Sequence, residues 1–106
     1  EKNEMSADVV IGSIYEIGNT VFSKDENKAL QFYLRAAEKG DGAAQNNVGR
    51  LLINKSSEDK LAISWLQKAA YNNISEAMYA LYQIYSKGTK DIPQDQEKAN
   101  YWLAQH

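Results

Sequence analysis

The sequence predicts an all-α fold built from three copies of a helix pair. The first observation is an internal repeat, in which alanines, glycines and aromatic residues recur in one register along the chain. The second is a three- to four-residue spacing of apolar side chains in both halves of each copy, which is typical of amphipathic helices. The third is the presence of capping and turn residues at equivalent places in successive copies.

The repeat is defined by small residues, starting with Ala7, Ala44 and Ala77. The other aligned positions are Gly12 with Gly49, Ala29 with Ala62 and Ala99, Phe32 with Trp65 and Trp102, and Ala36 and Ala37 with Ala69 and Ala70. We expect repeats at about residues 7–43, 44–76 and 77–106, the third being truncated before its Ala-Ala pair. The second copy is four residues shorter than the first, and the difference falls in the loop between its two helices.

The first copy begins with a helix predicted over about residues 7–18, where apolar residues follow three-four spacing. Its partner is predicted over about residues 29–37, and Ser23 with Glu26 has the capping-box spacing that marks a helix start. Gly40 is of a residue type that tolerates the left-handed position after a helix. Asp41 is then the N-cap candidate for the first helix of the second copy.

The second and third copies follow the same order. Ser56 precedes Asp59 with a weaker version of the capping spacing, at the start of the second copy's second helix. Asn73 ends that helix as Gly40 ends its counterpart, and Ser75 is the next N-cap candidate. Pro93 lies in the long third loop, just ahead of the last helix.

Small residues are predicted to lie where helices cross, because they let two backbones approach closely. Gly12 and Gly49 each cost about 1 kcal/mol in helix propensity, which close packing would justify. Tyr82 stands at this position in the third copy, so that crossing should be wider or rearranged. Trp65 and Trp102 share a repeat position and are expected in the core.

These residues resemble the Sel-one-like repeat, a branch of the tetratricopeptide superfamily. The resemblance covers about residues 7–106 and rests on AAQNNVG (43–49), VFSKDENKALQFYLRAAEKG (21–40) and DKLAISWLQKAAYNN (59–73). It implies an α-solenoid, an alpha-alpha superhelix of three antiparallel helix pairs with a concave groove. Such proteins usually act as adaptors or scaffolds for other proteins.

The resemblance also implies that the first helix of each pair lines the groove. The predicted partner-binding residues are Ser13 and Glu16 in the first copy, Asn46, Asn47 and Arg50 in the second, and Tyr79, Gln83 and Ser86 in the third, with Val9 and Ile53 on the same face. Asn and Gln side chains can pair with the amides of an extended peptide, and Arg50 can bind a carboxylate in bidentate fashion.

We therefore expect a single domain over residues 1–106 that binds a peptide segment or a protein surface and is not an enzyme. An alternative is a dedicated inhibitor or immunity protein that blocks a bacterial toxin or enzyme, with Glu16, Glu58 and Asp59 mimicking a substrate's charge. A third role is purely structural, as part of a larger array. Tyr101, Trp102 and Leu103 need a cover, which another repeat or self-association through the C-terminal end could supply.

Composition argues against other function classes. The net charge of −2 includes no basic stripe, so nucleic-acid binding is not expected, and the longest apolar stretches are far shorter than the ~20 residues of a membrane span. No cysteine is present, and the only histidine is the terminal His106, so Cys- or His-based catalysis, cofactors and metal sites are not expected. The penicillin-hydrolysing activity proposed for relatives belongs to a cysteine-rich subgroup.

The cellular location stays open on sequence grounds. A cysteine-free chain suits a reducing cytosol, and a cysteine-free periplasmic or secreted protein would have the same composition. The chain opens EKNEMS, with neither an initiator Met nor a signal peptide, so we expect a trimmed or mature segment of a longer protein.

Overall fold

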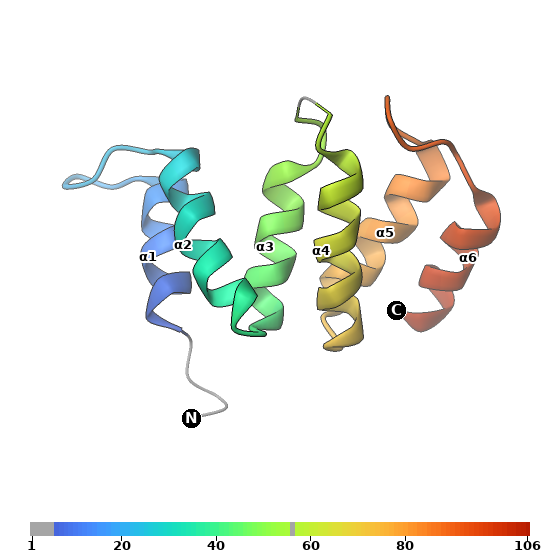
Figure 1. The fold of residues 1–106 in the computed structure, drawn as a ribbon, viewed down its shortest axis with the longest axis horizontal. Coiled ribbons are helices and arrows are strands. Elements are labelled where there is room, and N and C mark those ends of the chain that lie inside the picture. Colours follow the sequence, from blue (N-terminus) through green and yellow to red (C-terminus); the bar gives the residue numbers. More distant parts are fainter. Residues whose placement is uncertain (1–5, 56) are drawn as a thin grey trace.

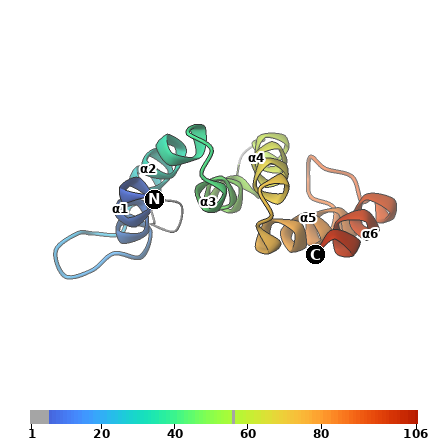
Figure 2. The same ribbon diagram turned by 90° about the horizontal axis from the view of Figure 1, so that it is seen from below.

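The computed structural model describes residues 6–55 and 57–106, which form six α-helices and no strand (Figure 1). The helices are α1 (Ala7–Ile17), α2 (Glu26–Glu38), α3 (Gly42–Leu52), α4 (Asp59–Tyr71), α5 (Ser75–Lys87) and α6 (Gln96–Gln105). Helices that are neighbours in the chain pack against one another, and Figure 2 shows them following one another along the long axis in a staggered order, with α2 and α4 above α1, α3 and α5 in that view. The predicted all-α solenoid of three helix pairs is confirmed.

Three helices have an aspartate as their N-cap. Asp25, Asp41 and Asp95 precede α2, α3 and α6, and each carboxylate accepts a hydrogen bond from the backbone N–H three residues later. The prediction for Asp41 is confirmed. The prediction for Ser23 is wrong, because the extended backbone at Asp25 places that carboxylate, two residues further on, against the free N–H groups of α2.

The other two predicted caps have different outcomes. Ser75 is the first residue of α5 rather than its N-cap, and the preceding Ile74 makes no side-chain capping bond. Ile74 instead packs against the core, so an apolar side chain takes the place of a polar cap. Ser56 lies outside the described residues; α4 has Glu58 at its N-cap position, without a side-chain bond.

The turns repeat as the sequence predicted. Gly40 and Asn73 follow α2 and α4 with φ of 99° and 65°, the left-handed conformation expected there. The loops of residues 18–25 and 88–95 share one design, in which Gly18 and Gly88 have positive φ and the N-cap aspartate N–H donates to a tyrosine carbonyl. The connection of residues 53–58 is two residues shorter, and α3 ends two residues earlier in repeat register than α1, so the four-residue deletion is shared between the loop and the end of α3.

The two helix-crossing glycines are buried against the second helix of their own pair. A Cβ on Gly49 would lie 2.5 Å from Leu66 Cγ, and one on Gly12 would lie 2.8 Å from the Tyr33 ring. The close backbone approach predicted at both positions is therefore present. At the third crossing Tyr82 is half-buried, and its ring contacts Tyr79 with centroids 5.6 Å apart.

Two clusters form the core, one in each half of the solenoid. The repeated alanines that lie in them are Ala29, Ala36, Ala37, Ala44, Ala62, Ala69, Ala70, Ala77 and Ala99. Ala7 does not lie in the core, contrary to the prediction that it faces a packing seam. Its counterparts belong to helices that follow another pair, whereas no helix precedes α1 among the described residues.

The two tryptophans differ in burial. Trp102 is buried, whereas Trp65 is only partly buried at the edge of the first cluster, so its expected core position is only partly correct. Lys68 lies 4.4 Å from the centroid of the Trp65 ring and covers part of it. The positively charged Nζ thus lies over the face of the indole, where the ring's electron density attracts a cation.

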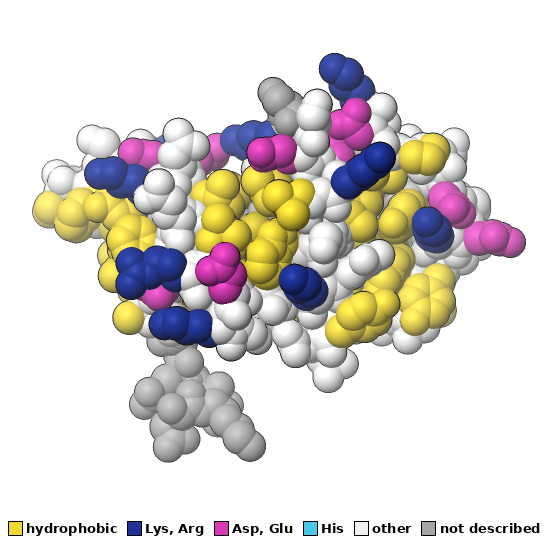
Figure 3. Space-filling model, in the orientation of Figure 1, with side chains coloured by type: hydrophobic (Ala, Val, Ile, Leu, Met, Phe, Trp, Pro, Cys, Tyr) yellow, Lys and Arg dark blue, Asp and Glu magenta, His cyan; other side chains and the backbone are white. Residues whose placement is uncertain are grey.

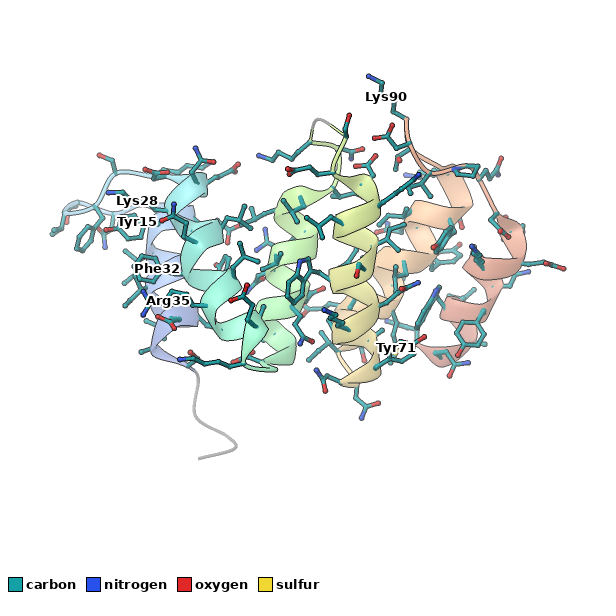
Figure 4. All side chains as sticks on the ribbon, viewed as in Figure 1. Tyr15, Lys28, Phe32, Arg35, Tyr71 and Lys90 are labelled. Atoms are coloured by element: carbon teal, nitrogen blue, oxygen red, sulfur yellow. The ribbon has the colours of Figure 1, made fainter. Side chains whose placement is uncertain are left out.

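A column of two stacked rings with a cation at each end joins α1 to α2 at the other end of the solenoid (Figure 4). Lys28 lies over the Tyr15 ring, Tyr15 stacks on Phe32, and Arg35 lies over Phe32, with centroid distances of 5.4, 5.8 and 5.6 Å. This column fixes the rotation of α1 against α2, and with it the direction in which the inner residues of α1 point.

Candidate functional site

A cleft of about 510 Å³ lies between α3 and α5, the first helices of the second and third pairs. Its lining residues come from these two helices, their following turns and α4: Asn46, Asn47, Arg50, Ile53, Asn54, Leu66, Glu76, Ala80, Gln83, Ile84, Lys87, Gly88 and Thr89. The volume falls within the ~300–1,000 Å³ that binding pockets usually have.

The cleft combines an apolar floor with carboxamides above it. Leu66 of α4 forms part of the base, where it also packs against Gly49, and the Ile53 and Ile84 side chains flank it. Asn46 and Gln83 supply amide groups from the two facing helices. Such groups offer donors and acceptors to an extended backbone while the floor can accept an apolar side chain.

The structure brings four of the eight predicted partner-binding residues into this cleft: Asn46, Asn47, Arg50 and Gln83. The other four do not line it. Ser13 bonds to the Val9 carbonyl and to the Tyr33 hydroxyl. Ser86 is half-buried, and its Oγ makes no hydrogen bond within the described part of the chain.

Arg50 was predicted to bind a partner's carboxylate, but it is already paired. Its two terminal nitrogens contact both carboxylate oxygens of Glu16 on α1, one of them at 3.0 Å. Arg50 Nη2, which makes the 3.0 Å bond to Glu16, also donates to Asn47 Oδ1 at 3.0 Å. The Tyr33 hydroxyl donates a hydrogen bond to Glu16 at 2.8 Å. This bidentate pair satisfies the guanidinium group of Arg50 from within the chain. The prediction that Arg50 is free to bind a partner's carboxylate is therefore corrected.

The pair also changes the ionisation of its members. The hydrogen bond from Arg50 holds the pKa of Glu16 below its usual range, and burial acts in the opposite direction. The same bond raises the pKa of Arg50. Burial raises the pKa of the Tyr33 phenol. Arg50 and Glu16 thus form an ion pair without net charge at physiological pH. The surface that these two side chains make between α1 and α3 carries no uncompensated charge.

The arrangement of repeated helix pairs has its counterpart in a known family. Three consecutive segments of the chain, residues 9–41, 42–74 and 75–105, each match the Sel1 repeat. The chain belongs to the Sel1 repeat family. Sel1 repeats generally mediate protein–protein interaction and are generally not enzymes.

Individual relatives agree with this assignment. A Sel1 repeat protein from Oxalobacter formigenes has a solved structure that superposes with a TM-score of 0.77 at 37% identity, over 92% of this chain and 41% of its own. A protective antigen of uropathogenic Escherichia coli with an SLR fold gives a TM-score of 0.84 over 92% of this chain and 21% of its own. At its 24% identity this likeness shows the fold alone.

Among curated proteins, an F-box protein of Arabidopsis thaliana is 36% identical over 58 residues, which is 54% of this chain and 16% of that protein. This chain therefore spans less than half of each of these longer proteins.

The cleft and the space between the first two repeats differ at one pair of equivalent positions in the Sel1 repeat register. Glu16 and Ile53 occupy equivalent positions in successive repeats, and so do Arg50 and Gln83. Between the first two repeats these positions hold the Glu16–Arg50 ion pair, which bridges the space. Between the second and third repeats they hold Ile53 and Gln83, which cannot form an ion pair, and there the cleft lies.

The same register explains why Tyr79 and Ser86 lie away from the cleft. They are the counterparts of Asn46 and Ile53, which face the following repeat. On α5 the equivalent edge faces away from α3, and there the Tyr79 ring contacts Tyr82 and His106. The first helix of one repeat and the first helix of the next thus line the space between them with opposite faces. The lining residues of the two helices therefore occupy different repeat positions.

The sequence reasoning missed several lining residues, above all Glu76 and Lys87. They lie on α5 with Ala80 and Gln83, at spacings of four, three and four residues that keep one helix face. This spacing was visible in the sequence. Glu76 and Lys87 would have been predicted if the face of α5 towards α3 had been treated as different from the face of α3 towards α5.

The acidic residues proposed for the inhibitor alternative are not a free acidic surface. Glu16 is neutralised by Arg50. Asp59 is buried, where Oδ1 accepts from the Asn54 N–H at 2.7 Å and Oδ2 from the Thr89 hydroxyl at 2.6 Å. Only Glu58 of the three is exposed. Mimicry of a substrate's charge by these side chains is therefore contradicted for Glu16 and Asp59.

The outer face differs from the cleft in character. Figure 3 shows hydrophobic side chains gathered over its middle and again towards its α6 end. At the α6 end Tyr71, labelled in Figure 4, and Tyr101 are exposed, and their rings lie 5.9 and 5.0 Å from that of Trp102. Leu103 is about half exposed, so the expected need for a cover at this end of the Sel1 array applies to its side chain and that of Tyr101.

Two classes of site are not found in the part of the chain that the structure describes. No cluster of three or more His, Cys, Asp or Glu side chains is placed to hold a metal ion. None of the described helices has the length and apolar character of a membrane span.

Proposed function

We propose that this chain is a non-enzymatic protein–protein interaction module that binds an extended segment of another protein in the cleft between α3 and α5. The observation that carries the proposal is the cleft itself, with its apolar floor at Leu66 and its carboxamides from Asn46 and Gln83. The general role of Sel1 repeats in protein–protein interaction supports it. The bound segment is a peptide or part of a larger protein surface, since both present a backbone and side chains.

The test uses peptides selected from a random display library on the wild-type chain. Their affinities for purified variants are then measured by isothermal titration calorimetry. Asn46→Ala and Gln83→Ala should each weaken binding by about 1 kcal/mol, because each removes a hydrogen-bonding group from the cleft. Gln31→Ala is the matched control, since Gln31 is exposed on α2 and does not line the cleft. It should bind as the wild type does.

Unchanged affinity in both cleft variants would refute the proposal. Tyr79→Ala extends the test to a predicted residue outside the cleft lining. If the bound segment ends within the cleft, Tyr79→Ala should bind normally. Weaker binding by this variant together with the cleft variants would mean that the binding surface continues past α5.

A further inference from the structure

The α5 wall of the cleft carries opposite charges at its two ends. Glu76 lies in the first turn of α5 and Lys87 in its last turn, and both are exposed and line the cleft. Ala80 and Ile84 lie between them, on the same wall. Within residues 6–55 and 57–106, neither charged side chain takes part in a salt bridge. Both charges are therefore available to a ligand.

The third charged group of the lining does not alter this pattern. Arg50 is held by both carboxylate oxygens of Glu16, which lies outside the cleft, so its charge is compensated within the chain. The cleft therefore presents one free anion and one free cation, at opposite ends of an otherwise neutral surface.

The spacing of the two charges can be compared with that of an extended peptide. Glu76 and Lys87 are 11 positions apart on one helix, which corresponds to about 16 Å along its axis. An extended chain advances about 3.3 Å per residue, so this length spans about five residues. Ala80 and Ile84 lie between the two charged residues on α5, and Ile53 of the facing repeat also lines the cleft, so the lining offers apolar surface to a side chain of that stretch.

We propose that the cleft recognises a protein segment with a basic and an acidic residue about five positions apart and an apolar residue between them. The basic residue pairs with Glu76, the acidic residue with Lys87, and the apolar side chain lies against Ile53 and Ile84. This inference rests on the proposed function and specifies the chemistry of the partner. Either chain direction satisfies it, because only the spacing of the charges is fixed.

Helix electrostatics alone also favours an acid in a first turn and a base in a last turn, without any ligand. The experiment must therefore separate recognition from helix stability. Two residues serve as matched controls: Glu97 is the acidic residue in the first turn of α6, and Lys68 is the basic residue in the last turn of α4. Neither lines the cleft.

The probes are three fluorescein-labelled eight-residue peptides with two variable positions five apart, a leucine three positions after the first of them, and serine at all other positions. The variable positions hold Lys and Glu, Glu and Glu, or Lys and Lys. Fluorescence polarisation gives the affinities. The wild-type chain should bind the Lys–Glu peptide about two- to fivefold more tightly than either like-charged peptide, the range expected for one exposed ion pair.

The chain variants should change this ranking in opposite ways. Glu76→Lys should prefer the Glu–Glu peptide and Lys87→Glu the Lys–Lys peptide, whereas Glu97→Lys and Lys68→Glu should keep the wild-type ranking. The preferences should shrink at ~0.5 M salt, since exposed ion pairs are screened. Replacing the leucine by serine should weaken all three complexes.

Failure of this inference is distinguishable from failure of the proposed function. If the three peptides bind equally and Gln83→Ala weakens all of them, the charge pattern is wrong and the cleft stands as the binding site. If none of the three peptides binds, the charge pattern is also overturned, and the library selection tests the cleft independently. If peptides bind but neither Gln83→Ala nor the charge variants alter their affinities, both are refuted.

Discussion

Gly49 is the residue at which the repeat is least tolerant of a larger side chain. A Cβ there would lie 2.5 Å from Leu66 Cγ and 3.1 Å from the Ala62 carbonyl oxygen, and backbone cannot move aside as a side-chain end can. We expect Gly49→Ala to lower the free energy of unfolding by about 2 kcal/mol, since overpacking costs more than the ~1 kcal/mol gained in helix propensity. Urea denaturation measures the difference.

Gly40 provides the comparison for this prediction. A Cβ on Gly40 would meet nothing within 4 Å, but its φ of 99° is unfavourable for alanine, so Gly40→Ala should cost only about 1 kcal/mol. Combining Gly49→Ala with Leu66→Ala should cost less than the sum of the two single changes, because the shortened side chain frees the space. Strict additivity would show that the contact with Leu66 is not what excludes the methyl group.

The Glu16–Arg50 pair predicts an acid-dependent contribution to stability. Because the folded pKa of Glu16 is lowered, its contribution is present above the unfolded value near 4.5 and is lost as pH falls through the folded pKa. Glu16→Gln keeps an acceptor for Tyr33 but removes the charge. It should therefore be less stable than the wild type by about 1 kcal/mol at pH 7.

The measurement is thermal or urea unfolding of both proteins between pH 7 and pH 3. The difference between them should be constant down to about pH 5 and then shrink toward zero as Glu16 protonates. A difference that stays constant to pH 3 would mean that the carboxylate's charge contributes nothing. Glu38→Gln is a suitable control, because Glu38 is exposed on α2 and forms no salt bridge within the described residues.

At the scale of single residues, contacts within one helix pair could be predicted from the sequence, whereas contacts between side chains of different repeats could not. The contacts of Gly12 and Gly49 follow from repeat register, because each faces the second helix of its own pair. Glu16 and Arg50 are 34 residues apart, and their pairing depends on the rotation of α1 relative to α3. The sequence assigned both to the groove but did not show that one would neutralise the other.

The connections between helices are joined in pairs by buried side chains. Asp59 accepts from the Asn54 N–H and the Thr89 hydroxyl, so the α3–α4 connection is tied to the α5–α6 loop. The α2–α3 and α4–α5 turns are linked by Gln45, which accepts from Asn72 at 2.9 Å and donates to the Ala37 carbonyl at 3.3 Å. Asn54 and Thr89 also line the cleft, so Asp59 positions part of its rim.

Thr89→Val tests this link with little change in side-chain shape. It leaves Asp59 Oδ2 without its hydroxyl donor in a buried place, so the free energy of unfolding should fall by about 1–3 kcal/mol. Urea denaturation provides the measurement. Thr20→Val, in the equivalent α1–α2 loop but exposed, should change stability by less than about 0.5 kcal/mol. Equal stability of the two variants would argue that Asp59 does not need Thr89.

At the scale of elements, the sequence located all three connections within helix pairs but not every cap. The deletion in the α3–α4 connection was predictable because it shifts the register of everything after it. Asp41 was predictable because an aspartate follows a glycine that ends a helix. Ser23 was predicted from its capping-box spacing to Glu26, but the residue that caps α2 depends on the path of the loop, in which the Asp25 N–H donates to the Tyr15 carbonyl.

The molecule as a whole is elongated, with extents of 44 × 32 × 21 Å and a radius of gyration of 14.1 Å. A globular domain of this length would have about 13 Å. The difference follows from packing each helix chiefly against its neighbours in the chain. The repeats made this shape predictable. The cleft between the second and third repeats was not predictable in the same way, because it lies where Ile53 and Gln83 replace the ion pair found between the first two repeats.

Nearest-neighbour packing predicts an uneven distribution of stability along the solenoid. Each of α2, α3, α4 and α5 packs against both of its neighbours in the chain, with α3 and α4 farthest from the two ends, whereas α1 packs chiefly against α2 and α6 against α5. In such arrays stability is approximately a sum of repeat and interface contributions. Backbone amides of α3 and α4 should therefore exchange most slowly with deuterium, and those of α1 and α6 should exchange faster, in native-state exchange followed by NMR.

A core substitution in the middle of the array sharpens this prediction. Leu66 packs in the cluster shared by α4, α5 and α6 and also contacts Gly49 of α3, so Leu66→Ala should cost about 2–5 kcal/mol. Its loss should lower protection in α3, α4 and α5 more than in α1, because the α1–α2 contacts are untouched. An equal fall in protection along all six helices would instead show one cooperative unit, in which the repeats do not open separately.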